Sequence, residues 1–407
     1  MTDTTTAGVL DDAAVHAGPA VDGAEVWLRR AEAVAVQLAA GAARRDREGT
    51  APLREVRLLK ESGLVTLLGP VEYGGGGQDW STAHRVARTV AAADASVGEL
   101  LAHHYVWVSI AEFIGTDEKI QHIGEVAARA RWFFSGSAKP RSAPLVIQDA
   151  GGDMLFHGRL DRALGHPVSD ITILEGFLED GDTPISALAM SDHPGLTFEP
   201  GAEEFGLRAL AAGTVVADHA DIPWTGALGH VDKTFVPRVY NTFLTPAFQL
   251  AQANVLIGAT RGALEAAAGH TRDRWSRAPL TEAAAADAAQ HYGALASLLW
   301  AVEAFADAVG AEADALHARR RTVTEEERGY HAVRVAALAA QAGAAADAVT
   351  AGVFGAAGAG GAEAEAGLDR FWRDTRARRV HDDDPGRGRV VGRHLLHGEV
   401  PRPTWYA

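Results

Sequence analysis

The chain has 407 residues and the composition of an ordinary globular protein, with 47% hydrophobic and 22% charged residues. Its formal net charge of -15 argues against nucleic acid as a partner, because such binding needs a concentrated positive surface that displaces counterions. The absence of cysteine excludes disulfides, thiolate nucleophiles and cysteine-ligated metals. We therefore expect a cytoplasmic protein without a metal site, divided into two or three domains.

Residues 1–22 are predicted to be a mobile tail. The stretch begins MTDTTTAGVLDD and has neither the basic start nor the apolar segment of a secretory signal. No later window approaches the roughly 18 uninterrupted apolar residues typical of a membrane helix. The sequence therefore predicts no membrane partner.

Residues 23–131 show helical periodicity and are expected to form an N-terminal helical domain. A run of four glycines, Gly74 to Gly77, interrupts the helices and predicts a sharp bend or a close approach. It lacks the Lys-Ser/Thr pair that would complete a phosphate-binding P-loop. Further on, Ser96 and Glu99 have the spacing of a capping box, which predicts a helix start at Ser96, and Thr116 is expected to start another helix.

Residues 132–240 change to short runs rich in β-branched and aromatic residues, separated by Gly, Pro, Asp and Ser. Such spacing without intervening helices predicts an antiparallel sheet or barrel. Residues 241–407 return to long, Ala-rich helical segments, one of them with Thr324 and Glu327 in capping-box spacing. A four-helix bundle is the economical way to bury such helices.

The most distinctive stretch is GLDRFWRDTRARRVHD, residues 367–382. It combines an arginine-rich helix, suited to binding phosphate or carboxylate, with a His-Asp pair in which the carboxylate can fix the imidazole tautomer. The motif resembles the C-terminal signature of flavin-dependent monooxygenases built on the acyl-CoA dehydrogenase fold, the group that includes dibenzothiophene monooxygenase and sulfur-acquisition oxygenases. Tyr73-Gly74-Gly75 followed by Trp80 also fits that superfamily.

This resemblance covers the chain from about residue 24 and implies an α+β fold. The implied order is an N-terminal helical domain, a central antiparallel β domain and a C-terminal four-helix bundle, assembled as a homotetramer. It also implies a two-component enzyme that accepts reduced FMN, or FAD, from a separate flavin reductase. With O2 it would oxygenate a small organic substrate at sulfur, nitrogen or aromatic carbon through a flavin C4a-hydroperoxide. The chain has no dinucleotide fingerprint for NAD(P)H, which agrees with external reduction.

The resemblance implies a catalytic role for His104, His381 and Asp382. Adjacent helical residues point about 100° apart, so only one of the pair formed by His103 and His104 can face a given pocket, and His104 matches the family position. His381 and Asp382 match the family's C-terminal pair. Where relatives often carry a second histidine this chain has Arg378, which cannot shuttle protons near neutral pH.

Five positions are implied to contact the cofactor. Arg274 matches an arginine that reaches a flavin phosphate across the tetramer interface, and Arg378 belongs to the C-terminal motif. The remaining three stand where relatives carry hydroxyl or thiol side chains, namely Ala163, Leu210 and Ala212. Their apolar character leaves two interpretations open: a pocket adapted to a different substrate, or weak or absent flavin binding.

Two alternative functions follow from these residues. Glu365 falls where one branch of the acyl-CoA dehydrogenases keeps its catalytic base, although it lies in the low-complexity run AEAEAG. The lost polar positions favour a flavin-free descendant of the fold with other chemistry. The sequence alone does not identify the substrate.

Overall fold

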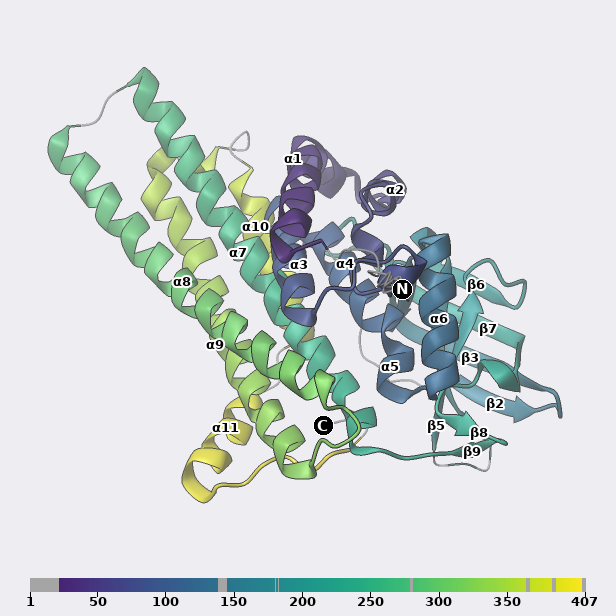
Figure 1. Ribbon diagram of the computed structural model, residues 1–407. Coiled ribbons are helices and arrows are strands. Elements are labelled where there is room, and N and C mark those ends of the chain that lie inside the picture. Colours follow the sequence, from purple (N-terminus) through teal and green to yellow (C-terminus); the bar gives the residue numbers. More distant parts are fainter. Residues whose placement is uncertain are drawn as a thin grey trace, which may run out of the picture.

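The computed structural model describes residues 22–137, 145–179, 181, 183–278, 281–363, 367–382 and 386–404. Residues 1–21, which cover almost all of the expected tail, lie outside this description. Helices come first, a sheet follows, and long helices complete the chain. Figure 1 shows the N-terminal helices between the sheet and the C-terminal bundle. The expected α+β class is confirmed, whereas the domain boundaries stay a prediction.

The regular secondary structure of the N-terminal region consists of helices alone within the described residues. Its α-helices are α1 (Ala24–Glu48), α2 (Leu53–Glu61), α3 (Trp80–Ala93), α4 (Ala95–Val108), α5 (Ile110–Ile114) and α6 (Asp117–Ala130). Thr116 caps α6 as expected. The predicted cap at Ser96 is wrong, because the side chain of Asp94, two residues earlier, accepts the hydrogen bond from the Val97 amide and caps α4. Glu99 is thereby free of a capping role and lies inside the helix.

The glycine run packs against its own chain. A side chain at Gly75 would place its Cβ 2.2 Å from the backbone of Gly69, and one at Gly76 would lie 2.5 Å from the ring of Trp27. The amide of Gly77 donates a hydrogen bond to the carbonyl of Gly69. The glycines are needed for this close approach of two backbone segments, in agreement with the absence of a P-loop signature.

The sheet follows at β1 (Phe134–Ser137). The other strands are β2 (Leu145–Asp149), β3 (Asp153–Leu164), β4 (Ile171–Leu178), β5 (Pro184–Met190), β6 (Leu196–Pro200) and β7 (Ala212–Pro223), with a small separate pair, β8 (His230–Val231) and β9 (Thr234–Phe235). The strand order is β1-β4-β2-β3-β7-β6, and β5 pairs with β4. The sheet is mixed rather than purely antiparallel, because β4 runs parallel to both β1 and β2.

The C-terminal region is a bundle of long helices. It contains α7 (Leu244–Arg277), α8 (Glu282–Ala318), α9 (Glu325–Ala357), α10 (Leu368–Asp382) and α11 (Gly386–His397). The capping box at the start of α9 is confirmed, since Thr324 accepts from the Glu327 amide and Glu327 accepts from the Thr324 amide. In Figure 1, α8 runs along the outer side of the bundle, away from the sheet.

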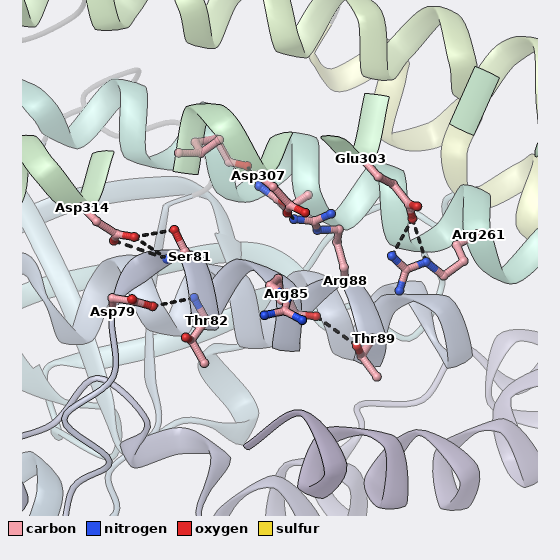
Figure 2. Close-up of polar contacts among 12 residues, drawn as sticks. Asp79, Ser81, Thr82, Arg85, Arg88, Thr89, Arg261, Glu303, Asp307 and Asp314 are labelled. Carbon is pink, nitrogen blue, oxygen red and sulfur yellow. Dashed lines mark hydrogen bonds and ion pairs between the residues drawn. The ribbon is translucent and has the colours of Figure 1, made fainter. Parts of the chain in front are cut away.

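Polar contacts join the N-terminal helices to α8. The carboxylate of Asp314 on α8 accepts hydrogen bonds from the backbone and side chain of Ser81 at the start of α3. About two helical turns farther along α3, Arg88 forms an ion pair with Asp307 of α8. Figure 2 shows both contacts side by side. Because Arg88 is buried, this pair fixes the register between the two helices.

By length and hydropathy, α8 and α9 could each cross a membrane. Neither helix contains the roughly 18 uninterrupted apolar residues that the sequence analysis used as its criterion. The most apolar window of α9 is half buried within the bundle, as in a core helix, whereas only 28% of the corresponding window of α8 is buried. Apolar side chains of α8 are therefore exposed in this chain, among them Leu298 and Trp300.

Candidate active site

A cavity of about 270 Å³ lies where the sheet meets α4 and α10. One part of its lining is apolar and comes from β3, the segment before β7 and β7 itself: Leu164, Leu207, Leu210 and Ala212. The other part is charged and includes Glu99 of α4, Arg162 of β3 and Arg378 of α10. The cavity therefore offers an apolar wall next to charged side chains, which is the usual composition of a small-molecule site.

Leu210 and Ala212, two of the expected cofactor contacts, both line this cavity. The segment that carries them is fixed to α10, because the buried carboxylate of Asp374 accepts a 2.7 Å hydrogen bond from the amide of Leu207. Gly206 permits this contact, since a Cβ there would lie 2.2 Å from the carbonyl oxygen of Arg373. Burial raises the pKa of Asp374 to about 7.

Ala163 does not line the cavity. It is fully buried in the sheet, where it pairs with Ser137 of β1 and Gly213 of β7. A shift in the β3–β7 register just before it places Arg162 in the left-handed region, with φ of 57°. Arg162, the neighbour of Ala163, lines the cavity instead, and the role expected for Ala163 stays a prediction.

Three buried ionisable side chains meet at the charged end of the cavity. On α4, Glu99 and His103 are one turn apart, and His103 Nε2 lies 3.1 Å from Glu99 Oε1. From α10, Arg378 Nε lies 3.4 Å from the same carboxylate oxygen. Each of the three is less than 10% exposed. The cluster places the expected residue Arg378 beside two residues that the sequence analysis had not assigned to the site.

Both guanidinium groups at the cavity have an N–H group that makes no hydrogen bond within the described residues. These two groups are the buried Nε atoms of Arg162 and Arg378. The pKa of Arg162 is lowered by burial and then by the positive charge of Arg378, so the two cations are neighbours. Buried donors without an acceptor cost free energy, and a bound molecule with carbonyl or anionic oxygens at this point would remove that cost.

His104 lies in the core rather than at the cavity. Its Nε2 is 2.7 Å from the carbonyl oxygen of Val65 and its Nδ1 accepts a 3.0 Å hydrogen bond from the amide of Phe134. The ring also stacks on Phe133 with centroids 4.7 Å apart. Complete burial lowers its pKa to about 4, so the imidazole is neutral. With both nitrogens bonded to backbone, His104 ties α4 to β1, and the expected catalytic role does not fit this geometry.

The remaining candidates lie elsewhere. Arg274 is exposed in the last turn of α7, next to Gly360, and does not line the cavity of its own chain. His381 and Asp382 are the last two residues of α10, and only their backbone positions are described. Glu365 lies outside the described residues. The roles expected for these residues therefore stay predictions.

Comparison with known proteins decides the family. The model of the acyl-CoA dehydrogenase N-terminal domain matches residues 29–130. Dibenzothiophene monooxygenase of Rhodococcus erythropolis is 30% identical over 392 residues, which cover 92% of this chain and 94% of the relative. The chain belongs to the dibenzothiophene monooxygenase family. The resemblance seen in its C-terminal motif is thereby confirmed.

Two further similar proteins use or bind FMN. The probable FMNH2-dependent monooxygenase SfnC of Pseudomonas putida is 25% identical over 387 residues, covering 93% of this chain and 97% of that protein. The structure of FMN-bound TdsC from Paenibacillus sp. A11-2 matches with a TM-score of 0.86 and 27% identity, covering 94% of this chain and all of that one. The fold of this family member is therefore that of an FMN-binding monooxygenase.

Proposed function

We propose that this member of the dibenzothiophene monooxygenase family is a two-component flavin-dependent monooxygenase. It would take reduced FMN from a separate reductase and oxygenate a small organic substrate at sulfur, nitrogen or an aromatic carbon. The two electrons come from reduced FMN. One atom of O2 enters the substrate. The other takes up these two electrons and two protons and leaves as water, and oxidised FMN is released as a further product.

The observation that carries this proposal is a pair of guanidinium groups beside an apolar wall, that of Arg378 buried and that of Arg162 partly buried. Isoalloxazine is a flat, largely apolar ring system with carbonyl oxygens along one edge, and it fits a cavity with that division. The Nε of Arg162, which makes no hydrogen bond within the described residues, and the guanidinium of Arg378, which is paired with Glu99, would bind such oxygens. Leu210 and Ala212 would contact the ring face through their apolar side chains. The loss of hydroxyl groups at these positions is therefore compatible with flavin binding.

The bound flavin supplies the chemistry of oxygen activation, and the residues around it hold charge and protons. Glu99 holds Arg378 at the cavity and provides the negative charge that allows a guanidinium to be buried there. His103, one turn along α4, can exchange a proton with Glu99 across the 3.1 Å that separate them. We assign to His103 the proton-handling role that the sequence analysis gave to His104, and we retain His381 and Asp382 as candidates.

A homotetramer is part of the proposal. Exposed apolar side chains of α8, among them Trp300 at 66% and Leu298 at 47% exposed, are suited to a subunit interface. Arg274 lies in the bundle outside the cavity of its own chain, where it could reach the FMN phosphate only in a neighbouring subunit. The cytoplasm, where a reductase can keep FMN reduced, is the expected location.

A specific observation keeps an acyl-CoA dehydrogenase as the second candidate. That reaction needs a carboxylate base, and Glu99 is a buried carboxylate at the cavity. The two candidates differ in their need for oxygen, because a dehydrogenase passes its electrons to another acceptor. A labelling experiment therefore separates them.

The test supplies the purified protein with chemically reduced FMN and 18O2, and uses dibenzothiophene or indole as probe substrate. Incorporation of one 18O atom per product molecule, analysed by mass spectrometry, is the expected result. Glu199→Gln, in an exposed pair with Arg159, serves as a control that should leave the yield unchanged. Turnover of an acyl-CoA with an artificial dye under anaerobic conditions, and no oxygen incorporation, would overturn the proposal in favour of the dehydrogenase.

A further inference from the structure

The outer face of the sheet carries a second irregularity in the β3–β7 ladder, distinct from the one at Arg162. Phe156 pairs with Ala220 and Gly158 with Ala217, so His157 alone of β3 lies opposite two residues of β7. Such an extra residue is a β-bulge, and bulges change the direction of the side chains they carry. Phe156, Ala217 and Ala220 are all buried in the core of the sheet.

The bulge turns two successive residues of β7 toward solvent. Because Ala217 and Ala220 both face the core, Asp218 and His219 between them both face outward, on the same side as His157. In a regular strand one of the two would point inward. The side chains of His157, Asp218 and His219 are 61%, 80% and 63% exposed, so each is free to adjust its rotamer.

The three side chains bring their ligand atoms together. His219 Nδ1 is 2.7 Å from Asp218 Oδ1, and His157 Nδ1 is 4.0 Å from the same oxygen. One nitrogen from each imidazole and one carboxylate oxygen all lie within 4.8 Å of one another. Metal–ligand bonds of about 2.0–2.2 Å place the ligands of one ion roughly 3–4 Å apart, a value between the two distances observed here.

The backbone of His219 is held in an unfavourable conformation to achieve this. Its φ is 53°, in the left-handed region that residues with a side chain rarely adopt. Glycine would meet no such penalty. The chain nevertheless has a histidine at this position, and its imidazole lies on the same face as Asp218 and His157.

We propose that His157, Asp218 and His219 form a binding site for a borderline divalent transition metal, of which Zn²⁺ is the reference case. Two imidazoles and one carboxylate suit Zn²⁺, Ni²⁺ or Cu²⁺, with water in the remaining positions, whereas Mg²⁺ and Ca²⁺ prefer oxygen ligands alone. The sequence analysis predicted no metal site and had no signal for this one, because His157 is distant in sequence from the adjacent residues Asp218 and His219. The pairing of β3 with β7 and its bulge bring the three together.

The consequence of metal binding is a clamp between β3 and β7. Farther along the same pair of strands, Arg162 and Ala212 line the cavity. A metal bridging His157 to Asp218 and His219 joins the two strands by coordination bonds and opposes their separation. This inference is independent of the proposed oxygenase activity, since it concerns ligands outside the cavity.

The test is a calorimetric titration of Zn²⁺ into the full chain after treatment with a chelator, at a pH above the ordinary pKa of histidine. One Zn²⁺ per chain is expected, with no competition from excess Mg²⁺. His157→Ala and His219→Gly should each weaken binding by more than the roughly 10–100-fold that changes outside the first coordination sphere can cause. His219→Gly relieves the backbone strain, so it removes the ligand without threatening the fold. His122→Ala, at an exposed histidine on α6, is the matched control.

A second measurement reports the clamp itself. Zn²⁺ should raise the melting temperature of the unmodified chain and leave that of His219→Gly unchanged. Zn²⁺ binding of equal strength in the unmodified chain and in a His157→Ala/His219→Gly double variant would overturn the proposal. Failure of the unmodified chain to bind Zn²⁺ or Ni²⁺ would overturn it as well.

Discussion

At the scale of single residues, the buried cluster of Glu99, His103 and Arg378 determines the character of the cavity. Removing one partner of a buried ion pair leaves an uncompensated charge, which costs about 3–5 kcal/mol. We therefore expect Glu99→Gln to lower the free energy of unfolding by about 3 kcal/mol, measured by urea denaturation. In a double variant with Arg378→Gln most of this loss should be recovered.

The exposed pair of Arg159 and Glu199 provides the comparison. Its side chains are 54% and 52% exposed, and exposed pairs contribute about 0–1 kcal/mol. Glu199→Gln should therefore change the free energy of unfolding by no more than that. Equal effects of Glu99→Gln and Glu199→Gln would contradict the burial of a charged cluster at the cavity.

Asp374 makes the stability of the protein depend on pH. In the folded protein its pKa is raised to about 7, mainly by burial, against an ordinary value of 3.8, although Arg370 acts in the opposite direction. The folded state therefore keeps a proton that the unfolded chain releases, and the free energy of unfolding falls as pH rises from about 4 to about 7. Each pKa unit corresponds to about 1.4 kcal/mol.

Asp374→Asn isolates this contribution. The amide oxygen can still accept the hydrogen bond from Leu207, but the side chain no longer titrates. Relative to the unmodified chain, the variant should gain stability as pH rises from 5 to 8, as followed by urea denaturation at both pH values. A constant difference between the two proteins would show that Asp374 has an ordinary pKa.

The two adjacent histidines show where sequence reasoning ends at this scale. The 100° between neighbouring helical residues predicted that only one of them can face a given pocket. Neither lines the cavity, but His103 lies next to it, in contact with Glu99. Which one does so depends on how α4 is rotated against β1, a tertiary contact made by the Phe134 amide and His104. The capping role expected for Glu99 was wrong for a related reason, because Asp94 rather than Ser96 caps α4 and Glu99 then lies inside the helix.

At the scale of elements, the segment from Gly206 to Ala212 links α10 to the cavity. Gly206→Ala would place a Cβ 2.2 Å from the carbonyl oxygen of Arg373 and push the segment away from α10. Overpacking of this kind costs about 1–3 kcal/mol. We expect that loss of stability together with weaker flavin binding, since Leu207, Leu210 and Ala212 move with the segment.

Gly293→Ala is the matched control for this variant. Gly293 lies in α8 with no atom within 4 Å of an added Cβ, and alanine is favoured over glycine in a helix by about 1 kcal/mol. Its melting temperature should stay the same or rise. If Gly206→Ala behaved like Gly293→Ala, the close contact between the segment and α10 would be disproved.

Helices and strands were largely predictable because their signals are local. The caps at Thr116 and Thr324 are examples in which side chain and backbone lie within one turn. The parallel pairing of β4 with β1 and β2 was not predictable, because the order of strands depends on contacts between distant segments. The same holds for the register shift that moves Arg162 to the cavity.

At the scale of the whole molecule, the exposed apolar side chains of α8 predict that several copies of the chain assemble. Trp300 is 66% exposed on an apolar helix, and a charge at that position would be buried without a partner in a subunit interface. Trp300→Glu should therefore convert the expected tetramer to smaller species, as determined by light scattering coupled to gel filtration. Val36, 74% exposed on α1, is a control position at which Val36→Glu should leave the assembly intact. A monomeric unmodified chain would contradict the assembly directly.

The measurement that tests the central claim most directly is an anaerobic titration of the chain with reduced FMN, followed by fluorescence. The account predicts saturable binding to one site per chain, weakened in Arg378→Gln because that side chain supplies a buried donor at the cavity. Glu199→Gln should bind as the unmodified chain does. Failure of the unmodified chain to bind reduced FMN or FAD would contradict the account, and would mark the apolar residues Leu210 and Ala212 as signs of a site without flavin.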